Sequence, residues 1–433
     1  MTIQLFTCAS VPTALAMAAA VDAGMLGSAQ RILLVSDETT IPEFAPSLRD
    51  TPGFATAAER FAQTLSWNET IAPAHPAAWT PRSEDRPLFE RMLRREWNLG
   101  SEPIELIVGS ATSAQSRALA TIFRSAPVTV CTASPEVYAP TPAALPTGMS
   151  SRIERLLHLD LVPGLTPHLL GEYGTPAEVI PPDAYRTLLT EAATQVNPPP
   201  GTALIAGTAE RAKDLTMLRA VAANGHKTIV YAPPPEAPTW PATSLATRMA
   251  NEAETLGVRL LTTDPAYPSA PVEVLCAALA PDLVVGCDVS ALLATWRYLD
   301  IPTAYASAEK NDDRQIPAII AAHVLPHLAT EGTLPLSGPT QAQAQADGLA
   351  RELGALVNAV SYCLRPGSRP DLRADASAYL ERHVGSPYFQ RERLAELGLP
   401  GGTPPQVEEP APPPPEPVAR KRGRITTRLL RSG

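Results

Sequence analysis

The stretch Thr202–Ala232 reads TALIAGTAERAKDLTMLRAVAANGHKTIVYA. Its first six residues form an apolar run with the length of a buried strand, a helical segment closed by Gly225 follows, and Thr228–Ala232 is a second apolar run. A strand, a helix and a strand within about 30 residues are the repeating unit of a parallel sheet. This stretch therefore predicts a doubly wound α/β domain.

The same alternation continues on both sides of this unit. Apolar runs of strand length recur before it, at 2–8, 31–37, 105–110 and 127–133, and after it, at 258–263 and 282–287. Helical segments separate most of these runs, which is the pattern of a parallel sheet with helices on both faces. The proline-rich break ATQVNPPPG at 193–201 divides the pattern into two halves. We therefore expect an α/β fold with two Rossmann-like domains that face each other across a cleft.

The length of 433 residues exceeds one comfortable hydrophobic core. We expect an N-terminal domain at 1–185, a linker at 186–200, a C-terminal domain at 201–335, further helices at 336–398 and a tail at 399–433. The tail begins with GGTPPQVEEPAPPPPEP, a composition that cannot bury a core and predicts disorder.

Composition and charge exclude several functions. The net charge of -9 argues against a general nucleic-acid binder, which needs a basic excess. Five cysteines that never form a C-x-x-C pair fit reduced thiols in a cytoplasmic protein. No apolar run reaches the roughly 18 residues of a membrane helix. Asp312 and Asp313 are adjacent carboxylates without the spacing of a cation site, so no metal is expected.

The common catalytic signatures are missing from the sequence: it has no Gly-rich phosphate loop followed by lysine, no G-x-G-x-x-G, no H-E-x-x-H and no G-x-S-x-G. One segment, VVGCDVSALL, places Gly286 and Ser290 where a strand passes into a helix. Backbone N–H groups and the Ser290 hydroxyl can hold a phosphate there. Ser290 can equally be the helix N-cap, so both interpretations stay open.

Two histidines are weaker candidates. His75 lies in a proline-rich loop, where contact with a ligand competes with a packing or surface role. His158 stands two residues from Asp160 in an apolar segment, which favours a satisfied structural pair over catalysis.

Several longer segments resemble one family. SWNETIAPAHPAAWTPR at 66–82, EWNLGSEPIELIV at 96–108, YAPT at 138–141, RLLHLDLVPGL at 155–165 and VVGCDVSALL at 284–293 are similar to the actinobacterial branch of the bacterial alpha-2,8-polysialyltransferase family. The resemblance spans roughly residues 3 to 330. It implies a GT-B-like glycosyltransferase fold, in which two Rossmann-like domains hold a nucleotide sugar between them.

The resemblance also implies a chemistry: transfer of sialic acid from CMP-sialic acid to a glycan acceptor, with no other cofactor. The family uses an acidic residue followed by glycine as general base, a His-Pro histidine at the departing phosphate and a serine or threonine pair. Alignment on YAPT puts Ala133 and Ser134 at the acidic residue and its glycine. Alignment on TIVYA puts Pro234 at the histidine, and Val289 and Ser290 keep one hydroxyl of the pair.

The expected nucleotide-sugar cleft comprises Gly207, Tyr231, Pro234, Gly286 and Ser290. Loss of a general base costs about 10²- to 10⁴-fold in rate. The sequence therefore favours a degenerate member of the family.

Two further interpretations stay open. The first is an active transferase with a relocated acid and base, for which Glu136 and His75 are the candidates. The second is a non-catalytic scaffold that acts through its tail.

The tail ends in ARKRGRITTRLLRSG, with six basic and no acidic residues between Arg420 and Arg431. Arg424, Arg428 and Arg431 recur at helical spacing, so a basic amphipathic helix can form on a surface that selects it. Weak tethering to the inner membrane face or to an acidic partner is one interpretation. A solvated end that only aids solubility is the other.

The tethering interpretation predicts that the full chain sediments with anionic vesicles at low salt, whereas a chain that ends at Leu399 does not. Each basic residue near an anionic surface contributes roughly 1 kcal/mol, so the attraction should weaken in salt. Co-sedimentation of both chains with anionic and neutral vesicles measures this difference. Equal sedimentation of the two chains would contradict a membrane role for the tail.

Overall fold

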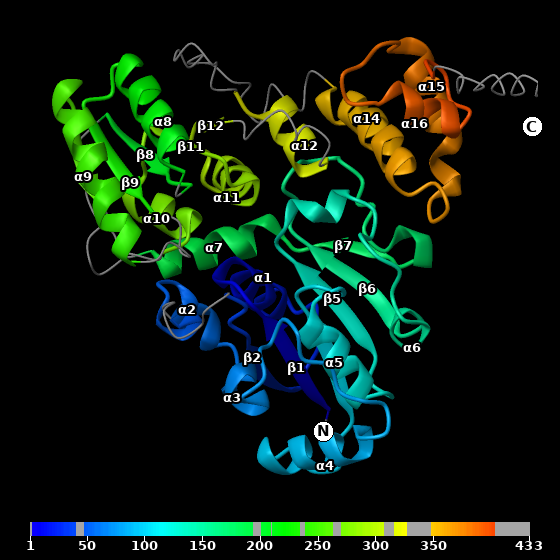
Figure 1. Cartoon of the computed structure of the whole chain (residues 1–433). Helices are drawn as coiled ribbons and strands as arrows, with labels where there is room; N and C mark the ends of the chain where they lie inside the picture. Colours follow the sequence, from blue (N-terminus) through cyan, green and yellow to red (C-terminus); the bar gives the residue numbers. More distant parts are fainter. Residues whose placement is uncertain are drawn as a thin grey trace, which may run out of the picture.

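The computed structural model describes residues 2–39, 47–193, 201–208, 210–233, 239–262, 270–306, 316–326 and 348–402. It shows two α/β domains and a group of C-terminal helices (Figure 1). The predicted fold class, with two doubly wound parallel sheets, is confirmed for this part of the chain.

The N-terminal sheet has seven parallel strands in the order β3-β2-β1-β4-β5-β6-β7. These strands are β1 (Ile3–Cys8), β2 (Gln30–Val35), β3 (Gln63–Ser66), β4 (Ile104–Val108), β5 (Val128–Thr132), β6 (Ile153–His158) and β7 (Ala177–Val179). The strand order reverses direction between β1 and β4, so the crevice above their carboxyl ends is the expected ligand position.

The C-terminal sheet has five parallel strands in the order β10-β9-β8-β11-β12. Its strands are β8 (Thr202–Ala206), β9 (Thr228–Ala232), β10 (Arg259–Thr262), β11 (Leu283–Gly286) and β12 (Thr303–Tyr305). The reversal here lies between β8 and β11. The carboxyl end of β11 leads directly into the pocket described below.

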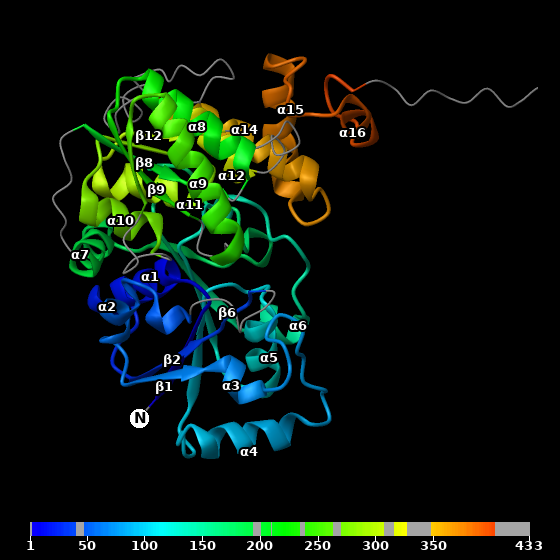
Figure 2. The ribbon, with the colours of Figure 1, turned by 60° about the vertical axis from the view of Figure 1, so that its left-hand side comes forward.

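Helices cover both sheets and extend beyond them (Figures 1 and 2). In the N-terminal half they are α1 (Val11–Asp22), α2 (Phe54–Ala58), α3 (Trp67–Ile71), α4 (Arg86–Glu96), α5 (Ala114–Ile122), α6 (Thr147–Ser150) and α7 (Pro182–Ala192). In the C-terminal half they are α8 (Arg211–Ala223), α9 (Thr239–Thr255), α10 (Val272–Leu279), α11 (Val289–Ala294), α12 (Ile316–Val324), α14 (Leu349–Leu364), α15 (Arg373–Arg382) and α16 (Arg391–Glu396). No helix among the described residues is long and apolar enough to span a membrane.

Local sequence explains most of these elements. Every residue of β1 is buried, because helices cover both faces of a parallel sheet and leave no solvent face for polar side chains. Ser10 begins α1 by accepting a hydrogen bond from the N–H of Thr13. Gly225 has φ +90° just after α8, which ends that helix where the sequence predicted.

Four strands were not predicted. β3 and β7 lie at the two edges of the N-terminal sheet and have the short, partly polar sequences QTLS and AEV, which lack an apolar run. β6 and β12 were also missed, the first because Glu154 and Arg155 interrupt its apolar residues. The segment SALLATWRYLD at 290–300 has a helical pattern, but the α-helix α11 ends at Ala294 and a π-helical turn, Thr295–Leu299, follows it.

Some predictions fall on residues outside the described ranges. They are Pro234 in the proline loop, the Asp312–Asp313 pair and the basic segment at 420–431. Their structural interpretation therefore stays a prediction.

The C-terminal helices return to the N-terminal domain. Arg369, just after α14, lies 3.0 Å from His168 Nδ1 and pairs with Asp371 at 2.8 Å. Burial lowers the pKa of His168 to about 4, and Arg369 adds to this effect, so the imidazole accepts the guanidinium hydrogen bond as a neutral ring. A side chain at Gly171 would meet this guanidinium at 2.8 Å, so the glycine leaves room for the pair.

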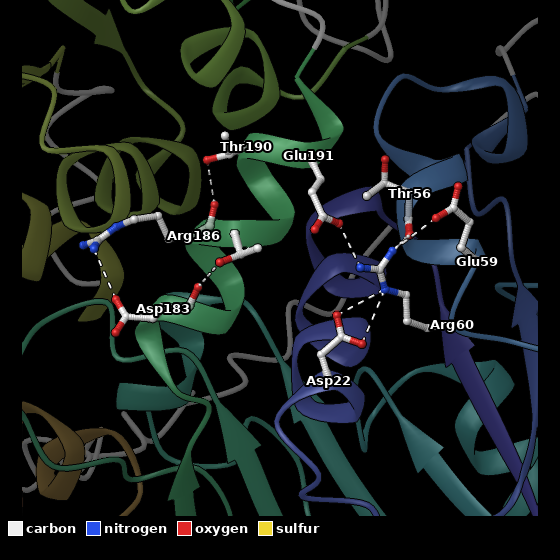
Figure 3. A network of polar contacts seen from close by, with 9 residues as sticks. Asp22, Thr56, Glu59, Arg60, Asp183, Arg186, Thr190 and Glu191 are labelled. Atoms are coloured by element: carbon white, nitrogen blue, oxygen red, sulfur yellow. Dashed lines mark hydrogen bonds and ion pairs between the residues drawn. The ribbon is translucent and has the colours of Figure 1, made fainter.

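Helix α7 joins the two domains, and Arg60 anchors it to the N-terminal one. The Arg60 guanidinium lies 2.8 Å from Glu191 of α7, 3.1 Å from Asp22 of α1 and 3.3 Å from Glu59 (Figure 3). It also donates to the carbonyl of Thr56 at 3.0 Å. One cation thereby connects α1, the end of α2 and α7.

The same helix contacts the C-terminal domain through Tyr185. The rings of Tyr185 and Tyr298 pack edge to face with centroids 4.9 Å apart, and both side chains are buried. Arg186 donates to the carbonyl of Tyr298 at 2.8 Å. Beside them, Arg297 pairs with Asp160 of the N-terminal domain at 3.1 Å. Asp160 is therefore engaged across the domain boundary, and His158 is buried but bonds instead to the carbonyl of Leu159.

The Tyr185 hydroxyl is buried and has no hydrogen-bond partner within the described ranges. We expect Tyr185→Phe to leave the free energy of unfolding unchanged or to raise it by about 1 kcal/mol, because it removes an unpaired polar group and keeps the ring. Tyr185→Ala should lower it by about 3–5 kcal/mol through loss of the ring contact. Urea unfolding of both variants measures the two effects. A loss above about 1 kcal/mol in Tyr185→Phe would show that the hydroxyl is satisfied.

Candidate functional site

The site lies above the carboxyl ends of β1 and β4, where the N-terminal sheet reverses direction. Gly109 follows β4, and a Cβ there would come within 2.9 Å of the Thr13 side chain and 3.1 Å of the Thr7 carbonyl. The glycine thus lets the loop after β4 approach the start of α1. Ser110 and Ser113 follow, and the Ser113 hydroxyl caps α5 by accepting from the N–H of Ser116 at 3.1 Å.

A cavity of about 780 Å³ opens over this edge. Ser110, Thr112, Ser113 and Gln115 form one wall, and Arg365 after α14 contributes a cation from the C-terminal helices. Glu38 and Glu136 also line the cavity. Gln115 is 2% exposed, and its Nε2 has no hydrogen-bond partner in the described structure. The cavity therefore offers hydroxyls, an amide and charges of both signs to a ligand.

A second pocket, of about 390 Å³, lies between the two domains. The N-terminal domain contributes residues from the carboxyl ends of its strands, and the C-terminal domain contributes the first turns of α10 and α11. The lining residues that bear on its chemistry are Ser10, Ser36, Asp37, Ala133, Ser134, Glu273, Asp288 and Ser290. We call it the interdomain pocket. It shares Ser10 and Ser134 with the larger cavity, so the two open side by side.

Glu273, in the first turn of α10, is the most unusual residue of the interdomain pocket. Its side chain is 3% exposed and forms no ion pair among the described residues. Burial raises the pKa of Glu273 to about 7, and the neighbouring Asp288 carboxylate adds to the increase. A buried carboxyl group that exchanges its proton near neutrality is typical of functional sites. A glutamate in the first turn of a helix is an ordinary helix-start pattern, so the sequence alone did not mark Glu273 as a site residue.

Asp288 caps α11. Its Oδ1 accepts hydrogen bonds from the N–H of Ser290 at 2.9 Å and of Ala291 at 3.3 Å. Desolvation raises the pKa of Asp288, and these two hydrogen bonds oppose the increase. Of the two interpretations left open for Ser290, the N-cap is therefore wrong, since Asp288, two positions earlier, occupies that role. A carboxylate already fills the position at which a phosphate would meet these N–H groups.

All the charged side chains that line the interdomain pocket are acidic, among the residues described. Asp37, Glu273 and Asp288 line it, and no lysine, arginine or histidine does so in the part of the chain that the structure describes. Asp37 takes a hydrogen bond on Oδ1 from the Thr39 hydroxyl at 3.0 Å. Hydroxyl and carboxylate groups thus dominate the polar surface.

Three residues expected in the nucleotide-sugar cleft serve packing in the C-terminal domain. The Tyr231 hydroxyl donates to the buried Asp214 at 2.8 Å, and burial with the adjacent carboxylate raises its pKa far above the ordinary range. A Cβ on Gly207 would come within 2.5 Å of that hydroxyl, and a Cβ on Gly286 within 2.8 Å of Ala206. Neither the ring nor the glycines line the two cavities described above.

The other predicted site residues divide between the two cavities. Ala133 follows β5 and is 5% exposed in the wall of the interdomain pocket, which Ser290 shares. Glu136 lies in the larger cavity, in the turn capped by Ser134. His75 lines neither cavity, and its Nε2 lies 3.0 Å from the carbonyl of Thr39.

No known protein-family profile matches the sequence, and no curated protein matches it. The comparison with solved structures found likenesses at low identity and low TM-score. A Phytolacca americana UGT2 complexed with UDP-2fluoro-glucose and pterostilbene is 10% identical, with a TM-score of 0.44, over 88% of this chain and 100% of that one. The Escherichia coli heptosyltransferase WaaC with ADP-2-deoxy-2-fluoro heptose is 14% identical, with a TM-score of 0.36, over 81% and 100%. MurG of Acinetobacter baumannii is 12% identical, with a TM-score of 0.39, over 88% and 100%. At such TM-scores the fold assignment rests on the two strand orders themselves.

Glu273 makes the stability of the protein depend on pH. Between about pH 4.5 and 7 the folded state keeps a proton that the unfolded chain has released, so the free energy of unfolding should fall as pH rises through this window. The fall is on the order of 3 kcal/mol for a shift of this size. Glu273→Gln should remove it and be more stable than the wild type at pH 8.

Urea unfolding at pH 5, 6, 7 and 8 measures this difference. Glu254→Gln, at an exposed position of α9, is the matched control and should follow the wild type at every pH. Parallel pH profiles for the wild type and Glu273→Gln would show that the carboxyl group does not titrate in this window.

Proposed function

We propose that this chain is a glycosyltransferase-type protein, related to the polysialyltransferase family, whose cleft has lost the usual catalytic pair. The position of Ala133 carries this proposal. Its side chain lies in the wall of the interdomain pocket, at the position where the resemblance puts the general base. A methyl group cannot accept the proton of an acceptor hydroxyl.

The departing group poses a second difficulty for sialyl transfer. CMP leaves with negative charge on its phosphate, and enzymes neutralise such charge with positioned donors or cations. The described wall of the interdomain pocket carries three acidic side chains, of which Glu273 is protonated below about neutral pH, and no basic side chain. Loss of one donor to the developing charge costs about 10²- to 10³-fold, in addition to the cost of the missing base. A nucleotide sugar such as CMP-sialic acid would therefore bind weakly in this pocket and turn over poorly.

One observation supports a second candidate function, an active transferase with a relocated base. Glu273 lines the same pocket as Ala133 but comes from the opposite domain, and its carboxyl group holds a proton up to about neutral pH. Among the residues described, it fits a general base better than Glu136 or His75. Glu136 lies in the neighbouring cavity, and His75 is bonded to a backbone carbonyl outside both.

The scaffold interpretation depends on the tail at 420–431, outside the described residues, and is tested by the vesicle experiment above.

The degenerate interpretation predicts no detectable sialyl transfer by the purified full chain with CMP-sialic acid and an oligosialic acid acceptor. Ala133→Asp combined with Pro234→His should recover at most weak activity, because the residues that would orient these groups are also changed. Radiolabel transfer measures activity, and calorimetry with CMP measures occupancy independently. Robust transfer by the unmodified chain would overturn the proposal. If Glu273→Gln then abolishes that transfer and Glu254→Gln does not, the relocated base is identified.

A further inference from the structure

The interdomain pocket raises the question of which ligand suits a site without cations. Its described lining contains the carboxylates of Asp37, Glu273 and Asp288 among serine and threonine hydroxyls. We infer that the interdomain pocket binds an uncharged, hydroxyl-rich ligand, such as a neutral sugar, in preference to a phosphorylated or carboxylated one. This inference rests on the proposed function, because both concern the interdomain pocket.

Electrostatics disfavours anionic ligands at this position. A phosphate or carboxylate in a pocket of about 390 Å³ would lie within a few ångströms of at least one of the lining carboxylates. Like charges repel more strongly at such a partly desolvated site than in bulk water. The helix N-terminus that could offset the repulsion is already capped by Asp288.

Hydroxyl groups complement the same lining. A sugar hydroxyl can donate to a carboxylate and accept from a serine or threonine hydroxyl, so each ligand group finds a partner of the opposite kind. Above about pH 7, where its carboxyl group is ionised, Glu273 is suited to this role because it is buried and forms no ion pair in the described structure. Hydrogen bonds to a charged group are stronger than those between neutral groups.

A second observation is independent of the carboxylates. Ser36, which follows β2 and lines the same pocket, is fully buried, and its hydroxyl has no hydrogen-bond partner among the described residues. Its backbone N–H donates to the carbonyl of Cys8 at 2.9 Å, so this N–H is satisfied whereas the hydroxyl is not. Buried hydroxyls in native structures are nearly always paired, and an unpaired one at a pocket wall indicates a missing partner. A ligand hydroxyl can supply that partner.

The size of the pocket agrees with a small sugar. Ligand sites commonly measure about 300–1,000 Å³, and the interdomain pocket lies at the low end of this range.

A cationic ligand is the competing possibility for an acidic pocket. No cluster of three metal-ligating side chains occurs within the described ranges, which disfavours a metal ion. Binding of an organic cation is tested with an amino sugar in the experiment below.

The test uses the purified full chain and matched ligands that differ only in charge. Methyl glycosides of glucose, galactose and mannose are the neutral ligands. The corresponding uronic acids, the sugar 1-phosphates and the 2-amino sugars are the charged ones. Saturation-transfer NMR detects weak binding at pH 8, and titration gives Kd for each ligand. We expect at least one neutral glycoside to bind about tenfold more tightly than its uronic acid, the equivalent of one hydrogen bond to a charged group.

Variants connect the binding to the pocket. Glu273→Gln and Ser36→Ala should each raise the Kd of the neutral glycoside. The double variant Glu273→Gln with Asp37→Asn should move the ratio of the Kd values for the uronic acid and the neutral glycoside toward one. Glu254→Gln on the exposed face of α9 should change neither value. Circular dichroism confirms that each variant is folded. Ser36→Ala keeps the test decisive if a charge variant fails to fold.

Three results would overturn the inference: no neutral glycoside binds, a uronic acid or sugar phosphate binds as tightly as its neutral counterpart, or the amino sugar binds most tightly. Sialyl transfer from CMP-sialic acid would overturn the proposed function instead. The inference would still be judged by the ratio between neutral and anionic ligands, so the two failures can be told apart.

Discussion

The contact between helix α7 and the two domains is the interaction on which the site depends. Tyr185 packs against Tyr298 in a fully buried position, and Glu191 of the same helix pairs with Arg60 of the N-terminal domain. Arg297 and Asp160 form a second charged link across the same boundary. These contacts set the relative position of two sheets that have no strand in common. Without them, the first turns of α10 and α11 would not face the ends of β1 and β5.

Close approach at this boundary also requires a residue without a side chain. Gly53 has φ +88°, and a Cβ there would lie 3.1 Å from Val274 of α10, 3.3 Å from Val11 of α1 and 3.5 Å from Ala192 of α7. Its conformation is one that other residues rarely adopt. The position therefore joins three helices from both halves of the chain, next to the interdomain pocket. It explains how α10 brings Glu273 so near to the N-terminal strand ends.

The interdomain pocket buries acidic side chains without a described cation beside them. This arrangement affects both the protonation of Glu273 and the kind of ligand that the pocket favours. A buried carboxylate without a cation is costly, so Glu273 holds its proton at higher pH than an exposed glutamate. The same absence of described cations makes the pocket unfavourable for phosphate and leaves hydroxyl groups as its natural partners. On the function that we propose, the chain keeps a carbohydrate site while it loses transfer chemistry.

The sequence by itself determined the two doubly wound sheets, because strand and helix periodicity are local properties. The mostly apolar β1 and the unit from Thr202 to Ala232 could be identified without knowing any long-range contact. It also identified Ala133 and Ser290 as positions of interest, and both line the interdomain pocket. The cap at Asp288 is local, and the sequence interpretation placed it two residues late, at Ser290. Glu273 and Ser36 could not be found from the sequence. Their significance depends on burial and on neighbours more than 200 residues apart in the chain, and only the packing of the two domains brings Ser36 and Glu273 to the same cavity.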